Sequence, residues 1–227
     1  MIKFEKVSKI YKTKNKKEIL ALDNVSFEIK EGDLVLIVGP SGAGKTTIFK
    51  LILGNEKPNE GKIFFRGKEI SKIRGKEISH LRRKIGMIFQ DYKLLQQKNV
   101  YENLSFIMEV TNFPEKEIKR DIPKVLELVG LEEKIENFPD ELSAGEKQRL
   151  AIARALIHRP KVILADEPTG NLDLCNSLEI LKILKRINET GRSIIIATHS
   201  NEVVNYLRKR VIYLEEGKIV GEKRAEK

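Results

Sequence analysis

One eight-residue segment of the chain has the composition and spacing of a phosphate-binding loop. Residues 39–46 read Gly-Pro-Ser-Gly-Ala-Gly-Lys-Thr, after the apolar run 34–38 and before a helix-like segment, 46–53. Glycines let the backbone turn tightly and bring its N–H groups close to phosphate oxygens. The helix that follows adds its positive end to the same place. The lysine can reach the β- and γ-phosphates, and the threonine hydroxyl can hold Mg²⁺.

The loop therefore predicts a site for the triphosphate of a nucleotide, with magnesium. We expect the whole loop and the next residue of the helix to contact it. These residues are Gly39, Pro40, Ser41, Gly42, Ala43, Gly44, Lys45, Thr46 and Thr47.

Two carboxylates follow a second apolar run. The segment 162–165 reads Val-Ile-Leu-Ala and leads into Asp166 and Glu167. In α/β sheets the carboxyl ends of strands line the ligand crevice. Asp166 is thus placed to hold Mg²⁺, directly or through water, and Glu167 to orient or deprotonate the attacking water. An Asp-Glu pair at the end of a strand is frequent on protein surfaces. The pair indicates a nucleotide site only because a phosphate-binding loop lies upstream in the same chain.

The segment Ser143–Glu146 has two interpretations that do not exclude each other. Ser-x-x-Glu is a capping box that begins a helix, which we expect to run to about His158. A helix N-terminus rich in Ser and Gly is also an anion site that suits a γ-phosphate.

Composition limits the class of protein. The chain has 227 residues, of which 33% are charged and 41% hydrophobic, as in an ordinary soluble enzyme. A single cysteine, Cys175, excludes an internal disulfide and suits a reducing cytosol. No stretch approaches the ~20 apolar residues of a membrane span, and the first residues do not resemble a signal peptide. We therefore expect any membrane connection to go through another polypeptide or the lipid surface.

The formal net charge of +10 has three competing explanations. Nucleic-acid binding is one, but no aromatic interleaving or nucleic-acid motif accompanies the basic clusters. Attraction to an anionic cytoplasmic leaflet is another. Solvated surface lysines of no special function are the third. We place surface lysines first and the membrane surface second, and we expect no nucleic acid.

The order of elements predicts the fold class. Residues 2–7 and 25–29 alternate apolar with polar, as in half-exposed antiparallel strands, with 12–17 as a loop between them. Short strands are expected at 63–65 and 85–89. From about 91 to 142 helical periodicity dominates, with helices at 101–110 and 115–129.

Two prolines and a glycine mark the helix at 115–129. Pro114 suits a first helical position, and Gly130 suits a C-terminal cap. Pro123 lies inside the helical pattern and should kink or split it.

From Ser143 onward, helix and strand alternate, with strands at 161–165 and 193–197, a helix at 174–189 and a closing hairpin at 211–220. This alternation predicts a largely parallel sheet with helices on its faces. We expect one α/β domain over 1–227, with the core and a β subdomain in about 1–90 and 143–227 and a helical sub-lobe in about 91–142.

The segment 142–148, Leu-Ser-Ala-Gly-Glu-Lys-Gln, resembles the signature motif of ATP-binding-cassette (ABC) ATPases. The resemblance covers about residues 2–220, with every family motif in order, and implies a P-loop NTPase (RecA-like) core. It implies that Tyr11 stacks on adenine and that Gln90 touches Mg²⁺ and reports to a membrane partner. Asn171, Leu172 and Asp173 resemble the D-loop, and His199 resembles the switch histidine near the γ-phosphate.

The resemblance also implies a head-to-tail homodimer with ATP at the interface. Each ATP would lie between the phosphate-binding loop of one copy and the signature residues of the other, which are Ser143, Ala144, Gly145 and Glu146. Within the family the chain is most similar to cell-division ATPases that act on an integral membrane protein, at the cytoplasmic face of the membrane. ATPase subunits of lipoprotein-release or macrolide-export systems, and a soluble nucleic-acid-associated ABC protein, are the alternatives.

Two residues depart from the family pattern. Ala144 replaces the usual first glycine of the signature, so the backbone there must avoid positive φ. Ser200 replaces the acidic residue that often follows the switch histidine. Because Ser143 and Gly145 remain, we expect activity to survive.

Overall fold

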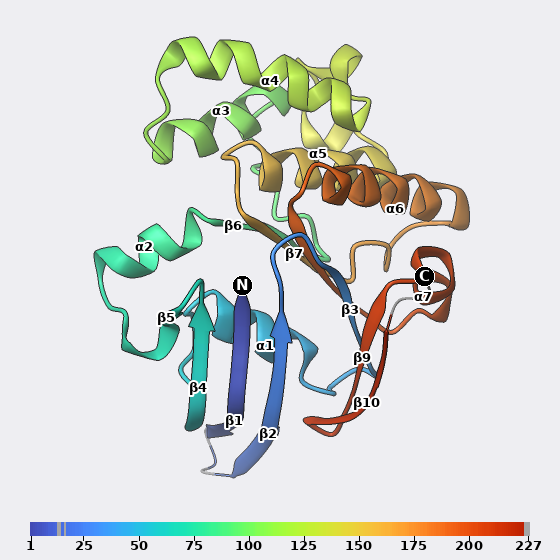
Figure 1. The fold of residues 1–227 in the computed structure, drawn as a ribbon. Coiled ribbons are helices and arrows are strands. Elements are labelled where there is room, and N and C mark those ends of the chain that lie inside the picture. Colours follow the sequence, from blue (N-terminus) through green and yellow to red (C-terminus); the bar gives the residue numbers. More distant parts are fainter. Residues whose placement is uncertain (13–14, 16, 225–227) are drawn as a thin grey trace. The chain divides into compact units, whose positions relative to one another are not determined.

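The computed structural model describes residues 1–12, 15 and 17–224 of the chain. The chain divides into two compact units (Figure 1). Unit 1 comprises Met1–Arg82 and Ser193–Lys227, and unit 2 comprises Arg83–Arg192. The division into core and helical sub-lobe expected from the sequence stays a prediction.

Unit 1 contains an antiparallel sheet in the order β2-β1-β4-β5 (Figure 1). Its strands are β1 (Ile2–Lys12), β2 (Glu18–Ile29), β4 (Glu60–Phe65) and β5 (Lys68–Glu69). Phe4 of β1 stacks on Phe27 of β2 with ring centroids 4.5 Å apart.

The predicted antiparallel pairing of residues 2–7 with 25–29 is confirmed, but both strands are longer than predicted. Register shifts after Phe4 and Val7 leave Val7, Ser8 and Lys9 buried in succession, so the polar–apolar alternation is lost where the strand continues. Lys12 ends β1 and does not begin the expected loop. Residues 13, 14 and 16 of that loop lie outside the described residues.

Unit 1 also holds a set of strands in the order β10-β9-β3-β8. These are β3 (Leu34–Val38), β8 (Ser193–Thr198), β9 (Arg210–Glu215) and β10 (Lys218–Lys223). Strand β3 pairs in parallel with β8 and β9, and both β3 and β8 are buried along their whole length. The closing hairpin, β9–β10, is confirmed.

The helices of unit 1 are α1 (Lys45–Ile52), η1 (Ile70–Lys72), α2 (Lys76–Arg82) and α7 (Asn201–Leu207). Of these, α1 was predicted. Helices α2 and α7 were not, because seven residues make only two turns, which is too short for a clear helical period.

Unit 2 pairs β6 (Ile85–Ile88) in parallel with β7 (Val162–Asp166). It also holds α5 (Ala144–Leu156) and α6 (Leu174–Glu189). Helix α5 lies so close to β6 that a Cβ at Gly86 would lie 2.2 Å from the backbone oxygen of Ala155. Glycine at this position lets the signature helix pack directly on the strand that precedes Gln90.

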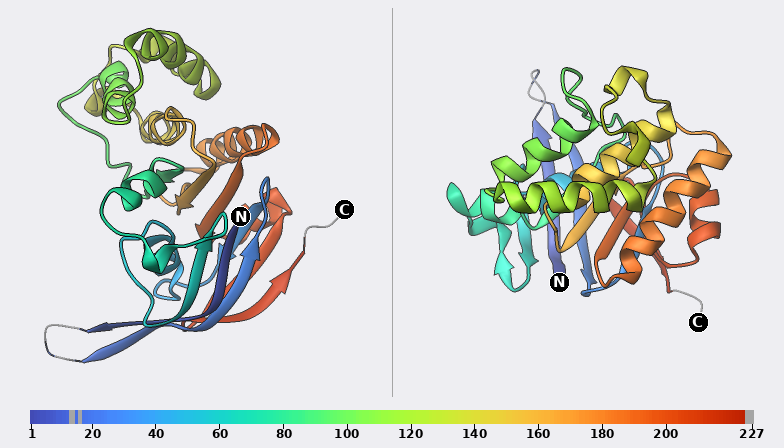
Figure 2. Two further views of the ribbon diagram at one scale, coloured as in Figure 1. Left: turned by 60° about the vertical axis from the view of Figure 1, so that its left-hand side comes forward. Right: turned by 90° about the horizontal axis from the view of Figure 1, so that it is seen from above.

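The rest of unit 2 is helical, as predicted. It consists of α3 (Val100–Val110), α4 (Glu115–Val129), η2 (Glu132–Lys134) and η3 (Pro139–Glu141). Figure 2 shows α4 lying against α3 and α5. No helix within the described ranges is long and apolar enough to cross a membrane.

Helix α4 corrects two expectations. Pro114 is its N-cap, one residue before the predicted first helical position, while Gly130 is the left-handed C-cap expected, with φ 66°. Pro123 does not split the helix, which runs unbroken from residue 115 to 129. Pro123 is exposed, so its ring projects into solvent and the buried face of α4, which includes Ile122 and Leu126, continues past it.

Candidate functional site

The register of the parallel strands places two predicted site segments of unit 1 at one edge. Val38, the last residue of β3, pairs with Thr198, the last residue of β8. The phosphate-binding loop begins at the next residue of one strand, and His199 is the next residue of the other. The two segments therefore follow the carboxyl ends of neighbouring strands and begin side by side. Nucleotides bind at the carboxyl ends of parallel strands in α/β sheets.

The glycines of the loop are required by geometry. Gly42 and Gly44 have φ of 82° and 106°, a left-handed region that favours glycine. A Cβ at Gly39 would lie 2.0 Å from the backbone oxygen of Leu214 on β9. A Cβ at Gly44 would lie 2.5 Å from the backbone oxygen of Ala21 on β2. The loop is thus held tightly by the strands around it.

Lys45 reaches back over the loop from the first position of α1. Its side chain is 7% exposed, and Nζ donates to the backbone oxygens of Gly39 at 2.7 Å and Pro40 at 3.0 Å. The first N–H groups of α1 have no partner within the helix. An ammonium group and a helix N-terminus therefore meet in one loop, and both favour a phosphate anion. Thr46, which follows Lys45, is exposed, and Thr47 is buried.

Tyr11 lies near the end of β1 and is half-buried. The Nζ atoms of Lys9 and Lys50 lie 4.9 Å and 5.9 Å from the centroid of its ring, so two cations already lie near the ring. Its hydroxyl is buried and has no hydrogen-bond partner among the residues that the structure describes. The stacking of Tyr11 on adenine stays a prediction.

The structure gives a local reason for the departure at Ser200. Ser200 is the N-cap of α7, and its hydroxyl accepts a hydrogen bond from the N–H of Val203 at 3.3 Å. The same hydroxyl donates to Glu202 at 2.8 Å. A serine at this position therefore begins the helix that follows His199, whose side chain is exposed.

In unit 2, strand register brings the acidic pair and Gln90 to one edge. Ile88 of β6 pairs with Ala165 of β7, so Gln90 and Asp166 follow paired residues. A Cβ at Gly170 would lie 3.5 Å from both Nε2 of Gln90 and the Cβ of Glu167. Gln90 and Glu167 are thus close neighbours.

Glu167 has a strained backbone. Its φ of 47° lies in the left-handed region, which costs a residue other than glycine roughly 1–3 kcal/mol. The N–H of Gly170 donates to the backbone oxygen of Glu167 at 3.1 Å and closes a turn there. Other residues of the chain, such as Asn112 and Glu216, have a similar φ, so the turn fixes the position of Glu167 without by itself indicating a role in chemistry.

The signature residues begin α5 as a complete capping box. The hydroxyl of Ser143 accepts from the N–H of Glu146 at 3.3 Å, and the Glu146 carboxylate accepts from the N–H of Ser143 at 2.8 Å. That backbone hydrogen bond lowers the pKa of Glu146. Ala144 is the first residue of the helix, so the expectation that its backbone avoids positive φ is confirmed.

The D-loop segment and the signature segment meet through Asn176. Asp173 is the N-cap of α6, and its carboxylate accepts from the N–H and from Nδ2 of Asn176, at 2.9 Å and 2.7 Å. These hydrogen bonds, the backbone one first, lower the pKa of Asp173. A Cβ at Gly145 would lie 2.3 Å from Oδ1 of the same asparagine. The first turns of α5 and α6 therefore touch at a glycine of the signature.

Three side chains hold the segment that follows Gln90. Nδ2 of Asn171 donates to the backbone oxygen of Gln90 at 3.0 Å. Arg154 of α5 donates to the backbone oxygen of Tyr92 at 2.7 Å and to that of Lys93. Asn103 of α3, which is fully buried, accepts from the N–H of Leu95 and donates to backbone oxygens farther along the segment.

Sequence reasoning missed Arg154 and Asn103 as positioning residues. Each lies at an unremarkable position of a helix, and its partners are backbone groups. A backbone group carries no residue-type signal, so only the folded chain identifies these contacts.

Comparison with known proteins agrees with this arrangement. A model of the ABC transporter family matches residues 22–170, and the chain belongs to this family. The prediction of the family and of a P-loop α/β fold is confirmed, and the chain is an ATPase of the ABC type.

Its relatives include proteins named cell division ATP-binding protein FtsE. The one from Streptococcus pneumoniae strain D39 is 49% identical over 88% of this chain and 87% of its own length. The one from Bacillus subtilis strain 168 is 46% identical over 97% of this chain and 95% of its own length. The one from Escherichia coli K12 is 42% identical, with coverages of 97% and 98%. These relatives support the predicted assignment to a cell-division ABC system.

Solved structures show the same fold. The dimeric ATP-binding cassette MJ0796 bound to ADP and Pi, in a post-hydrolysis state, matches with a TM-score of 0.90 and 34% identity over the whole of both chains. A second dimeric structure of MJ0796, described as a bacterial ABC transporter cassette, matches with a TM-score of 0.91 and 35% identity.

Proposed function

We propose that this chain is the ATP-hydrolysing subunit that drives an FtsX-like integral membrane protein in cell division and thereby signals cell-wall hydrolysis. The observation that carries the proposal is the similarity to proteins named for cell division and ATP binding over nearly the whole chain. The likeness extends through the phosphate-binding loop, the signature segment and the segment between Gln90 and α3. Through the membrane partner, the chain would lie at the cytoplasmic face of the membrane.

In the proposed site, unit 1 binds the nucleotide. Tyr11 would stack on adenine, and the amides of Gly39–Gly44 and the ammonium of Lys45 would surround the β- and γ-phosphates. Because Lys45 already donates to two backbone oxygens of the loop, it is preorganised above the place that a phosphate would take. His199, at the same edge of the sheet, would contact the γ-phosphate.

Magnesium suits the hydroxyl, amide and carboxylate side chains that the sequence predicts for it. No group of three His, Cys, Asp or Glu that could hold a metal ion occurs in the described part of the chain. Mg²⁺ bound with a nucleotide needs no such cage, because phosphate oxygens and water supply most of its ligands. The residues that would hold it are Thr46, Gln90 and Asp166, and a bound ion would neutralise charge on the phosphates.

Hydrolysis would depend on Glu167. A carboxylate there would accept a proton from water as the water attacks the γ-phosphate in line. Its hydrogen-bonded turn and its position near Gln90 support this role, because a general base needs a fixed position.

The site would be completed by a second copy of the chain. Ser143, Ala144, Gly145 and Glu146 would face the γ-phosphate bound to the other copy, with the D-loop residues Asn171, Leu172 and Asp173 beside them. The dimeric form of MJ0796 supports this arrangement. The capping box uses the hydroxyl oxygen of Ser143 as an acceptor, so its O–H is still able to donate to a phosphate.

The partner would dock near the segment 90–101 and α3. Two apolar side chains one turn apart on α3 are exposed there, Phe106 by 38% and Val110 by 58%. Nζ of Lys98 lies 6.0 Å from the ring of Phe106, so the segment and this exposed face are adjacent. Asn171, Arg154 and Asn103 hold this segment by hydrogen bonds. A displacement of the segment by the bound partner would therefore also move Gln90.

One substitution tests the partner. Phe106→Glu should abolish co-purification of the candidate FtsX-like protein, because a charge would replace an apolar contact. The ATPase activity of the isolated chain should not change. Val220→Glu, on an exposed apolar residue of unit 1, is the control. Undiminished co-purification of the Phe106 variant would refute this docking surface.

A transport function is the second candidate, since MJ0796 is described as a transporter cassette. ATPase assays on the chain reconstituted with its membrane partner distinguish a transport function from the proposed function. A transporter subunit should hydrolyse ATP faster when its solute is added, whereas the proposed subunit should respond to its membrane partner alone.

A further inference from the structure

One buried lysine of unit 1 has no part in the chemistry proposed above. In the part of the chain that the structure describes, the buried lysines are Lys45, beside the phosphate-binding loop, and Lys9, in the middle of β1. Lys9 is 8% exposed. Burying an ammonium group costs free energy unless the group is paired and hydrogen-bonded. An apolar residue on the strand would avoid this cost, so the charge of Lys9 calls for an explanation.

The hydrogen bonds of Lys9 lead to the turn that follows α1. Nζ donates to Oε2 of Glu56 at 2.7 Å and to the backbone oxygen of Lys57 at 2.9 Å. The N–H of Glu56 in turn donates to the backbone oxygen of Lys50, in the last turn of α1, at 3.3 Å. Lys9 therefore connects β1 with the helix that follows the phosphate-binding loop.

The residues on either side of Lys9 hold the same turn through their backbone groups. The N–H of Ile10 donates to Oδ1 of Asn59 at 2.8 Å. The N–H of Asn59 donates to the backbone oxygen of Ser8 at 2.9 Å. These bonds do not involve the ammonium group, so a neutral side chain at position 9 would leave the strand attached to the turn.

The ammonium group of Lys9 also lies over the ring of Tyr11. Nζ is 4.9 Å from the ring centroid, within the roughly 6 Å of a cation–π interaction. Nζ of Lys50 is 5.9 Å from the same centroid, but the Lys50 side chain is exposed. Because a desolvated cation is attracted to a ring more strongly than a hydrated one, Lys9 interacts with the ring more strongly than Lys50 does.

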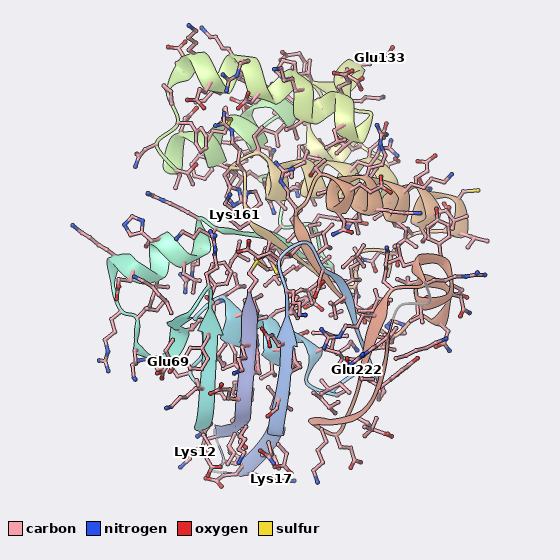
Figure 3. All side chains as sticks on the ribbon, in the orientation of Figure 1. Lys12, Lys17, Glu69, Glu133, Lys161 and Glu222 are labelled. Carbon is pink, nitrogen blue, oxygen red and sulfur yellow. The ribbon has the colours of Figure 1, made fainter. Side chains whose placement is uncertain are left out.

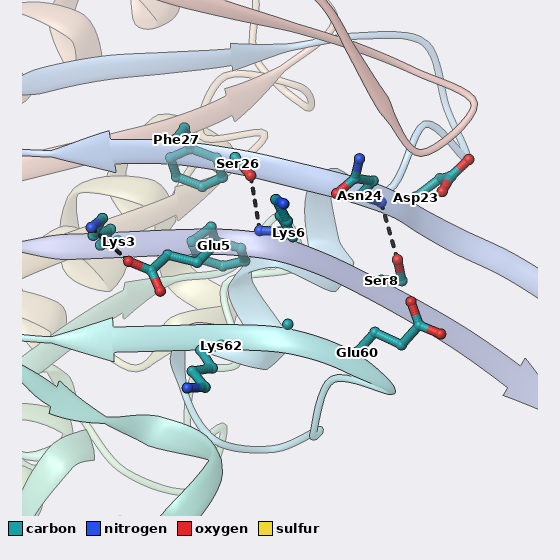
Figure 4. A pocket seen from close by; sticks show the side chains of 12 residues that line it. Lys3, Glu5, Lys6, Ser8, Asp23, Asn24, Ser26, Phe27, Glu60 and Lys62 are labelled. Atoms are coloured by element: carbon teal, nitrogen blue, oxygen red, sulfur yellow. Dashed lines mark hydrogen bonds and ion pairs between the residues drawn. The ribbon is translucent and has the colours of Figure 1, made fainter.

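Two other ion pairs of β1 differ from the pair of Lys9 with Glu56. Lys3 pairs with Glu5 at 2.6 Å, at the hollow of about 860 Å³ over β1, β2 and β4 (Figure 4). Lys12, labelled in Figure 3, pairs with Glu18 of β2 at 3.3 Å. Both lysines are exposed, and exposed ion pairs contribute little to stability. Lys3 and Lys12 therefore provide controls on the same strand.

We propose that Lys9 is a positioning residue for recognition of the nucleotide base. It fixes the ring of Tyr11 relative to α1. A ring that is already ordered loses less conformational entropy when a base stacks on it, so the base binds more tightly. Because α1 follows the phosphate-binding loop, the two ends of the nucleotide would be held at a fixed spacing. The inference rests on the stacking of Tyr11 on adenine, which belongs to the proposed function.

The experiment measures the affinity of the full chain for Mg-ADP by calorimetry, because ADP carries the base and is not hydrolysed. Lys9→Met removes the charge and nearly keeps the length of the side chain. It should weaken binding roughly 3- to 20-fold, because the cation over the ring is lost. Lys9→Arg keeps a cation that can pair with Glu56, so it should bind Mg-ADP nearly as tightly as the wild-type chain.

A double-mutant cycle with Tyr11 distinguishes positioning of the ring from a general structural role. Tyr11→Ala should weaken the binding of Mg-ADP by itself. In the Tyr11→Ala background Lys9→Met should have no further effect, because no ring is left to position. A lysine that only stabilised the fold would change the affinity equally in both backgrounds.

The control variants are Lys3→Met and Lys12→Met, which remove the same charge from the same strand. Both should stay within about twofold of the wild-type affinity, because solvent and salt screen exposed charges. Lys12 follows Tyr11 directly, so its variant also controls for the loss of positive charge near the base. Circular dichroism shows whether each variant is folded. If Lys9→Met does not fold, Lys9→Gln replaces it, since glutamine keeps a hydrogen-bond donor and lacks the charge.

The cycle decides the proposal in either direction. A loss of affinity in Lys9→Met that disappears in the Tyr11→Ala background supports it. Unchanged affinity in Lys9→Met, with a loss in Tyr11→Ala, would overturn the role of Lys9 and leave the stacking of Tyr11 intact. Equal losses in both backgrounds would overturn the role of Lys9 too, and unchanged affinity in Tyr11→Ala would reject the stacking on which it rests. The membrane partner is absent from these measurements, so failure of the docking surface on α3 would not affect them.

Discussion

The two units of the molecule differ in net charge. Unit 1 carries the whole positive surplus of the chain, and Nζ of its buried Lys45 donates to the backbone oxygens of Gly39 and Pro40. Unit 2 has no net charge, and its Arg159 bridges Glu117 and Asp121 on α4. Unit 1 also pairs cations internally, as Lys9 with Glu56 at 2.7 Å, so the units differ in net charge and not in whether their cations are paired. A net positive charge attracts a polyanion such as a nucleotide.

The phosphate-binding loop of unit 1 and the signature turn of unit 2 also differ in what packs against their glycines. The atom nearest to a Cβ at Gly39 or at Gly44 would be a backbone oxygen. In unit 2 the close contact of Gly145 is with a side chain, Asn176. The loop is therefore confined by backbone atoms and the signature turn by a side chain, and the following substitutions test this difference.

The largest expected effect is on chemistry in unit 2. Glu167→Gln should lower the turnover number by roughly 10²- to 10⁴-fold, because the general base is lost. ATP binding should persist, and an ATP-bound dimer should accumulate. Steady-state phosphate release and size-exclusion chromatography with ATP measure the two effects. The control is Glu216→Gln, on a glutamate that also has a left-handed φ, of 46°, but lies in the hairpin turn. Hydrolysis near the wild-type rate would remove Glu167 from the mechanism.

The next effect contrasts two glycines. Gly39→Ala should destabilise the protein by about 3 kcal/mol, because the new methyl group meets a backbone oxygen that cannot move away. Gly145→Ala meets only the end of a side chain and should cost less, and adding Asn176→Ala should restore stability. Urea denaturation gives the free energies of unfolding. Equal costs for the two glycines would contradict this difference in what packs against them.

The binding role of unit 1 rests on Lys45. Lys45→Ala should weaken ATP binding roughly 10- to 100-fold, since a hydrogen bond to a charged group contributes about 1.5–3 kcal/mol. Calorimetry measures the affinity directly. The control is Lys30→Ala, which removes an exposed lysine of unit 1. Lys50, on the same helix as Lys45, is less suitable because it lies near Tyr11. Unchanged ATP affinity in the Lys45 variant would contradict its assignment.

Pro123 offers a gain in stability. A proline in a helix interior removes a backbone hydrogen bond and costs up to about 3 kcal/mol relative to alanine. Pro123→Ala should therefore stabilise unit 2 by about 2 kcal/mol, visible as a higher melting temperature. Lys124→Ala, the adjacent exposed position, should have no such effect. A lower melting temperature for the Pro123 variant would mean that the proline contributes packing.

The smallest effect depends on pH. Hydrogen bonds from Arg120 and Arg159 lower the pKa of Asp121 from 3.8 to about 2. A depressed pKa contributes stability above the unfolded value, and that stability is lost as the pH falls from 3.8 through 2. Asp121→Asn should cost about 1 kcal/mol at pH 7 after screening, and less at pH 3. Asp140→Asn is the exposed control, and a cost independent of pH would exclude the ion pair as its cause.

Much of the fold followed from local patterns. The apolar runs of β3 and β7 and the helix at 174–189 were predicted within a residue or so, because buried strands and a long amphipathic helix have strong periodicity. The bulged parts of β1 and β2, and the short helices α2 and α7, were not found. Bulges disturb the alternation, and two helical turns leave too little pattern.

The sequence by itself determined the chemistry. The order of glycines and lysine in residues 39–46, the acids after β7 and the Ser-x-x-Glu of the signature are local patterns whose meaning depends on residue type and spacing. The tertiary structure alone decided which distant groups support them, as with Arg154 on the Gln90 segment and Asn176 beside Gly145. Those contacts join residues far apart in the chain or involve backbone atoms, and strand register and helix packing, rather than spacing, bring them together.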